Sequence, residues 1–302
     1  MTQRVIDSEQ IEQFEGALRG TVIRPDDANY DDARAVWNGM IDKYPALIVR
    51  CHNAADVTTA VYFARENDLL VAVRGGGHNV AGSAVCDDGL VIDLSEMNGV
   101  HVDADSQTAR VEAGAVWADV DRETQAFGLA TPGGVVSDTG VAGLTLGGGI
   151  GHLRCKYGLS CDNLRSVDLV TADGAFLTAS EDENADLFWG LRGGGGNFGI
   201  ATSFEFELHS VGPDVAICLV FYPSDQLADC LRAYRKYVES APNEVSTLIF
   251  AGELPDEELF EGDDIHRQKF AIMGCYAGSV NDGTQVLSPL RELAVPIADL
   301  SG

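Results

Sequence analysis

Positively charged residues are scarce in this sequence, whose 302 residues include 20 lysines and arginines against 47 aspartates and glutamates. The formal net charge of −27 disfavours non-specific binding to nucleic acid or to an anionic membrane surface, because both would repel the protein. We therefore expect neither as a partner. The acidic residues are scattered along the chain. That distribution favours a solvated acidic surface, as in proteins of salt-adapted organisms, over a field that steers a cationic substrate.

Long hydrophobic runs are also absent, since no apolar stretch approaches the roughly 18 residues of a membrane span. The first residues lead into a polar, acidic segment without the apolar core of a secretory signal, so we expect a cytoplasmic protein. Seven cysteines, an odd number, argue against a disulfide framework. Cys218, Cys230 and Cys275 lie in apolar surroundings and are expected to be core thiols. The histidines do not cluster, so we expect no metal site.

Glycine, by contrast, is plentiful, and the first of three glycine runs lies in the stretch VAVRGGGHNVAGS, residues 71–83. The three apolar residues at its start predict the end of a buried strand. Gly75–Gly77 then predict a tight turn whose backbone N–H groups can approach an anion closely. Arg74 adds a forked cationic donor that suits phosphate. His78 follows the turn, where it is placed to contact, or to be bonded to, whatever the turn holds.

Two further glycine runs, residues 147–151 and 193–199, follow at intervals that suit one cofactor held by several loops. Neither run matches the phosphate-binding P-loop or the Rossmann fingerprint. The small residues between 135 and 151 would let a planar ring system lie directly against backbone. The alternative is an array of glycine-rich turns without a ligand.

Four segments, which include the three glycine runs, together resemble a known family. They are Arg74–His78, Val91–Ser95, Thr131–Asn163 and Trp189–Gly199. They are similar to the FAD-linked oxidoreductases of the vanillyl-alcohol-oxidase/PCMH superfamily, and within it to the berberine-bridge-enzyme-like branch. The resemblance implies that His78 is bonded to the 8α-methyl group of the flavin. Members with two covalent links also use a cysteine, and spacing places that position at or next to Val136. Because valine cannot form a thioether, we expect a single covalent link.

The resemblance and the glycine runs together predict the residues that contact the FAD. They are Arg74, Gly75, Gly76, Gly77, His78, Asn79, Ser83, Thr139, Gly140, Gly143, Gly147, Gly148, Gly149, Gly151, Asn197 and Gly199. His152 and Tyr157 either face the active site or have a structural role, and Arg192 either contacts phosphate or packs on the sheet. No catalytic residue is assigned by the sequence.

The fold class that we expect is α+β, with two domains. Residues 1–43 would form a helical entry region, 44–211 a PCMH-type FAD-binding domain of two α/β subdomains, and 212–302 a partial substrate domain with an antiparallel sheet and helices. Apolar patterning predicts the individual elements. The predicted strands are 46–49, 69–73, 90–94, 100–102, 109–112, 167–171, 176–179, 200–208, 215–222, 245–251 and 270–277. The predicted helices are 53–66, 116–127, 182–187, 224–240 and 284–293, and an acidic loop is predicted at 253–264.

The function implied by the resemblance is FAD-dependent oxidation of a small alcohol, sugar or amine, with hydride transfer to flavin N5. Dioxygen or another acceptor would then take the electrons. Two alternatives stay open: a dehydrogenase that does not use dioxygen, and a catalytically incomplete flavin-binding module. The second arises because family members continue well past the length of this chain. The sequence does not select the substrate.

Overall fold

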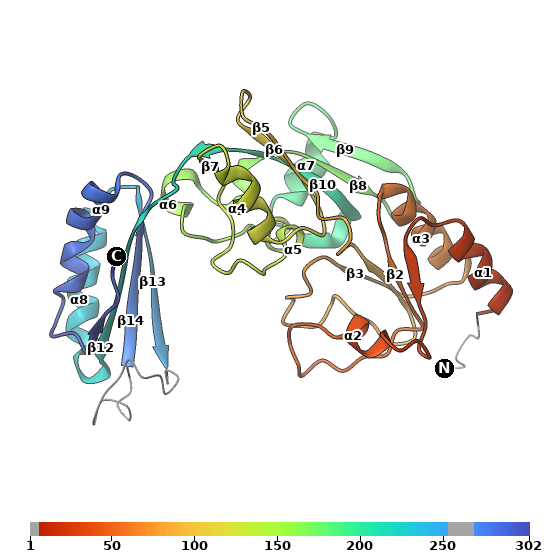
Figure 1. Ribbon diagram of the computed structural model, residues 1–302, viewed down its shortest axis with the longest axis horizontal. Coiled ribbons are helices and arrows are strands. Elements are labelled where there is room, and N and C mark those ends of the chain that lie inside the picture. Colours follow the sequence, from red (N-terminus) through yellow and green to blue (C-terminus); the bar gives the residue numbers. More distant parts are fainter. Residues whose placement is uncertain (1–5, 253–268) are drawn as a thin grey trace.

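The structure is a computed structural model that describes residues 6–252 and 269–302, and in this part of the chain the strands form four sheets. Figure 1 shows the elements in chain order. The helices are α1 (Ser8–Gly16), α2 (Tyr30–Arg34), α3 (Ala54–Glu66), α4 (Trp117–Gln125), α5 (Val141–Leu146), α6 (Arg154–Tyr157), α7 (Ala185–Leu191), α8 (Leu227–Val238) and α9 (Val280–Leu287), with 3-10 turns η1 (Ser160–Asn163), η2 (Gly195–Phe198), η3 (Ser224–Gln226) and η5 (Ser288–Arg291). The strands are β1 (Thr21–Ile23), β2 (Leu47–Arg50), β3 (Val71–Arg74), β4 (Leu90–Asp93), β5 (Val100–Asp103), β6 (Thr108–Glu112), β7 (Leu129–Ala130), β8 (Leu164–Val170), β9 (Phe176–Ser180), β10 (Ile200–Glu207), β11 (His209–Ser210), β12 (Ala216–Pro223), β13 (Val245–Gly252), β14 (Lys269–Tyr276) and β15 (Ala298–Asp299).

The first sheet has the strand order β1-β2-β4-β3, with β4 parallel to both of its neighbours. The predicted helix at residues 53–66 is confirmed as α3, whose cap, Asn53, accepts a hydrogen bond from the Asp56 amide. The strands on either side of α3, β2 and β3, do not pair with each other, because β4 lies between them. β3 therefore delivers the first glycine run from an edge of the sheet.

The segment before residue 44, expected to be a helical entry region, also supplies a strand. β1 pairs antiparallel with β2 and completes the first sheet. Phe14 of α1 stacks on Phe63 of α3, with ring centroids 4.1 Å apart. This segment therefore shares the hydrophobic core of the sheet that follows it. The domain divisions at residues 43 and 211 stay predictions.

The second sheet is antiparallel, with the order β5-β6-β10-β8-β9, and its central strands bury Phe204 and Phe206 completely. α4 packs beside it through Trp117, which meets Phe206 edge-on. The helix predicted at 116–127 would include Phe127, but the side chain of this residue is 54% exposed. The reason is that α4 ends at Gln125, so Phe127 lies beyond the last turn and points away from the core.

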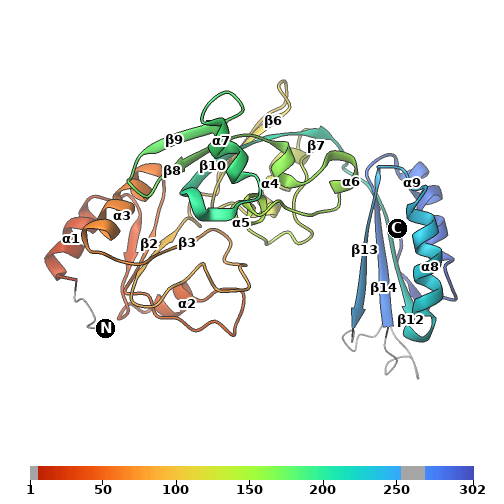
Figure 2. The same cartoon turned by 180° about the vertical axis from the view of Figure 1, so that it is seen from behind.

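The last sheet, β13-β14-β12-β15, is antiparallel, and α8 and α9 cover one of its faces, which confirms the α+β class (Figures 1 and 2). Helix 284–293 was predicted too late in the sequence. Ser279 caps α9 by accepting a hydrogen bond from the Asp282 amide, and the helix ends at Leu287 before Pro289 enters a 3-10 turn. The predicted acidic loop at 253–264 lies outside the described residues.

Helix α6 lies beside the last sheet, as Figure 2 shows. Three consecutive residues of α6 bond to strand ends of the last sheet. The Arg154 guanidinium donates to the Thr247 carbonyl, and the Cys155 amide donates to Ser246 Oγ at 3.3 Å. Lys156 Nζ donates at 2.9 Å to the carbonyl of Ala277, the residue that follows β14. These three hydrogen bonds thus fix the sheet against the rest of the molecule.

Two further findings concern the whole described chain. All seven cysteines are free thiols, and Cys218, Cys230 and Cys275 are buried as predicted. Burial raises the pKa of each of these three thiols, so they stay protonated and unreactive near neutral pH. Among the residues that the structure describes, no helix is long and apolar enough to cross a membrane.

Candidate cofactor site

The first glycine run meets the stretch 135–151, which ends in the second run and is counted with it, backbone to backbone. A Cβ atom added to Gly76 would lie 2.5 Å from the amide nitrogen of Gly140, and one added to Gly140 would lie 2.4 Å from that of Gly76. No side chain fits between the two loops. The second run also contacts the third, because α5 packs against η2. Segments far apart in the sequence thus come together at one place, as the spacing of the runs predicts.

His78 lies at the junction of the first two runs, and its side chain is 24% exposed. Its ring stacks on Trp37, with centroids 5.6 Å apart and planes inclined by 22°. Its Nε2 atom lies 3.8 Å from a carboxylate oxygen of Asp138, a residue of the second loop. Gly77, just before the histidine, has φ +72°, a conformation that glycine adopts without strain. The turn that presents His78 therefore depends on glycine.

The stretch 135–151 contains a helix that the sequence did not reveal. No helix was predicted there, but Val141–Leu146 form α5, with Gly140 at its cap. One glycine and one threonine weaken the helical pattern, and burial of Val141, Leu146 and Thr145 overrides the low helix propensity. Gly143 lies on the exposed side of α5 with open space around it.

The last glycines of the second run are buried against neighbouring loops of the same chain. Gly147 is exposed, whereas Gly148 and Gly149 are buried and have φ of +109° and +86°. A Cβ at Gly149 would meet Ser160 Oγ at 2.3 Å, and one at Gly151 would meet the Gly133 carbonyl at 2.0 Å. These buried positions require glycine to fit against neighbouring loops.

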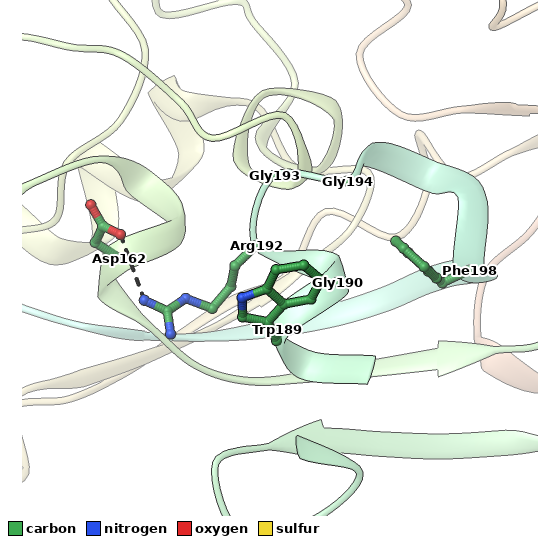
Figure 3. Close-up of a pocket in the computed structure, with 7 residues that line it drawn as sticks. All are labelled: Asp162, Trp189, Gly190, Arg192, Gly193, Gly194 and Phe198. Carbon is green, nitrogen blue, oxygen red and sulfur yellow. Dashed lines mark ion pairs between the residues drawn. The ribbon is translucent and has the colours of Figure 1, made fainter. Parts of the chain in front are cut away.

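The third run borders a pocket of about 400 Å³, shown in Figure 3. Trp189, Phe198 and Arg192 line it together with Asp162 and three glycines, and Trp189 is 80% exposed. Arg192, for which the sequence allowed two roles, donates to the Cys161 carbonyl at 3.0 Å and lies 3.6 Å from Asp162. In this structure it packs on its own chain.

The remaining predicted contact residues are held in loops around the junction. The Arg74 guanidinium donates to the Ala33 carbonyl. Asn79 and Ser83 are exposed and close a turn, in which Asn79 Oδ1 accepts from the Ser83 amide at 3.2 Å. The Thr139 carbonyl accepts from the Trp117 amide at 3.1 Å. In the third run, the Asn197 amide group donates to the Gly194 carbonyl, and Gly199 packs against the Val170 carbonyl.

Tyr157 and His152, for which the sequence left two roles open, are both partly buried. Tyr157 stacks face to face on His209 at 3.9 Å, and His209 Nε2 lies 2.6 Å from Asn163 Oδ1. Burial lowers the pKa of His209, and burial together with the charge of Arg154 lowers that of His152, so both rings are neutral at pH 7. Across residues 6–252 and 269–302 no group of acidic, histidine and cysteine side chains could hold a metal ion.

Comparison with known proteins identifies the domain that carries the first two glycine runs. Residues 45–180 match the model of an FAD-binding domain. The FAD-linked oxidoreductase pgmH of Aspergillus terreus is 40% identical over 229 residues, which cover 75% of this chain and 46% of that protein. The chain belongs to the berberine-bridge-enzyme-like FAD-linked oxidoreductases.

Two solved structures have the same fold as this chain. The 6-hydroxy-D-nicotine oxidase of Arthrobacter nicotinovorans superimposes with a TM-score of 0.86 at 32% identity, covering 94% of this chain and 61% of that one. The berberine-bridge-enzyme-like protein 1 of Physcomitrella patens gives 0.84 at 24% identity, covering 97% and 63%. The chain thus spans about half to three fifths of the length of the relatives that it matches.

The residues at the junction suit an FAD of this family. Gly76 and Gly140 let the two loops pack backbone to backbone, and Gly143 leaves open space on the exposed side of α5. The sequence flagged these glycines but missed Trp37 and Asp138. Asp138 lay within a recognised motif, although no pattern distinguished it from its neighbours. Trp37 lay in the presumed entry region, and only its stacking on His78 identifies it.

Proposed function

We propose that this protein is an FAD-dependent oxidoreductase that oxidises a small alcohol, sugar or amine and carries its FAD covalently through His78. The observation that supports the proposal best is the position of His78, at the contact of two glycine loops in a member of an FAD-linked family. The predicted contact residues of the three runs, from Arg74 to Gly199, would hold the FAD. When bound, the flavin would accept a hydride at N5 from the substrate.

The chain's own residues would provide the setting for that reaction. The exposed backbone at Gly143 and Gly147 would approach the FAD without side chains in between, and the contact of Gly76 with Gly140 would hold the two loops together. Figures 1 and 2 show α8 and α9 on the side of the last sheet that faces away from the glycine runs. The opposite face carries Leu219, Met273 and Leu248 side by side in the strand register. This half-buried apolar row would help to exclude water from a substrate held between sheet and flavin.

Acid precipitation of the purified protein tests the attachment. We expect a yellow pellet that retains flavin absorbance, and a colourless pellet with flavin in the supernatant would contradict a covalent link. The variant His78→Ala should lose the covalent flavin while its fold, judged by circular dichroism, is kept. Flavin that stays bonded in His78→Ala would refute this attachment site, and a second flavinylated peptide would refute the single link.

Anaerobic mixing with candidate substrates tests the activity. Bleaching of the flavin absorption band by an alcohol, a sugar or an amine would establish oxidation and name the substrate class. Rapid return of the colour on admitting air would support an oxidase, and slow return would support the dehydrogenase alternative. A flavin that none of these alcohols, sugars or amines bleaches would support the alternative of a catalytically incomplete flavin-binding module.

A further inference from the structure

We infer that Asp138 is a positioning residue for His78: its carboxylate holds the imidazole proton on Nε2 and leaves the lone pair of Nδ1 free to form the bond to the flavin. The inference rests on the proposed attachment at His78. Its geometric basis is the 3.8 Å separation between Nε2 and the carboxylate. At that distance the two groups interact electrostatically, and a carboxylate favours the tautomer that presents N–H toward it.

Asp138 is held in place by its neighbours. The Ser137 and Thr139 carbonyls, on either side of it, accept hydrogen bonds of 2.8 and 3.1 Å from the first amides of α4. The Thr139 amide donates in turn to the Val136 carbonyl, which closes the turn. The contact between Gly76 and Gly140 then fixes this turn relative to the one that carries His78. The approach of the two side chains thus follows from backbone contacts on both loops.

The other side of the imidazole is restrained by Trp37. The Trp37 amide donates to the Gly77 carbonyl at 3.2 Å, and the side chain of Asn38 donates to the Val80 carbonyl at 2.8 Å. These two bonds flank His78 in the sequence and keep the indole stacked on its ring. With one face covered and Nε2 directed to Asp138, the ring presents Nδ1 as its free atom.

In the covalent step, the bond between His78 and the flavin, the Asp138 carboxylate would act on the imidazole. Formation of a bond between Nδ1 and the flavin methyl carbon removes one hydrogen from that carbon and the proton from the imidazole, and delivers two electrons to the flavin. An acceptor such as dioxygen must remove these electrons afterwards. While the bond forms, the imidazole becomes positively charged, and the adjacent carboxylate of Asp138 stabilises that charge and can take the Nε2 proton.

The test compares rates of covalent attachment. Apoprotein from riboflavin-starved cells is mixed with FAD, and covalent flavin is followed as a fluorescent band after denaturing electrophoresis. Because the carboxylate is 71% exposed, we expect Asp138→Asn to slow attachment about tenfold rather than to abolish it. Asp105→Asn, which removes the same charge from the turn between β5 and β6, should react at the wild-type rate. Non-covalent FAD binding should change little in either variant.

A second readout needs no flavin at all. Nitrogen-15 spectra of the imidazoles in the apoprotein report which nitrogen carries the proton, and the His78 signals are assigned by their loss in His78→Ala. We expect the Nε2–H form in the wild type and a shift toward Nδ1–H in Asp138→Asn. Attachment at the wild-type rate in Asp138→Asn, or an unchanged tautomer, would overturn the role of Asp138. Wild-type protein that binds FAD without bonding it would instead refute the attachment itself.

Discussion

The substitution Gly140→Ala probes the contact between Gly140 and Gly76 of the first glycine run. Gly140 has φ −65° and ψ 136°, which alanine adopts without strain, so the effect is purely steric. The added Cβ would lie 2.4 Å from the Gly76 nitrogen and 2.7 Å from its Cα, whereas ordinary contacts begin near 3.4 Å. The two loops must therefore separate by about 1 Å. Overpacking of this kind costs about 1–3 kcal/mol, and we expect the upper half of that range because both partners are backbone.

Thermal unfolding of the apoprotein, followed by circular dichroism, measures this cost. At about 2–4 °C per kcal/mol for a chain of roughly this size, Tm should fall by about 4–12 °C. Gly143→Ala is the matched control, because its Cβ meets nothing within 4 Å and alanine is the better helix former by up to about 1 kcal/mol. Gly143→Ala should keep or raise Tm and yet weaken FAD binding. A Tm of Gly140→Ala within 1 °C of wild type would refute the steric reasoning, and unchanged FAD binding in Gly143→Ala would refute the contact predicted there.

Two further predictions concern stability. Asp56, which is 3% exposed, accepts hydrogen bonds from three backbone amides, so Asp56→Ala should cost about 3 kcal/mol in a urea titration, and a loss under 1 kcal/mol would contradict this role. Since burial lowers the folded-state pKa values of His152 and His209, the unfolded chain binds their protons first, and stability present above about pH 6.5 is lost as the pH falls. In the double variant His152→Asn with His209→Asn, the fall in Tm between pH 7 and pH 5.5 should be smaller than in the wild type. An equal fall would disprove the contribution of these two rings.

Local sequence determined most of the elements. Asn53 at a cap followed by an apolar face specified α3, and alternation specified strands such as β10. The three glycine runs and His78 identified the cofactor surface, because few structures other than close backbone approach require so many residues without a side chain. The helix α5 could not be predicted in the same way, since its stability comes from burying Val141 and Leu146 rather than from its composition.

The sequence alone therefore determined the α+β class, the family and the chemical character of the glycine runs. These depend on residue types and spacings that are local or that recur in a fixed order. Tertiary structure alone decided that Gly76 meets Gly140, that Trp37 covers His78 and that Asp138 faces its Nε2 atom. Each of these contacts joins loops separated by tens of residues. Their distances follow from how these loops pack on one another, and no local pattern of side chains encodes that packing.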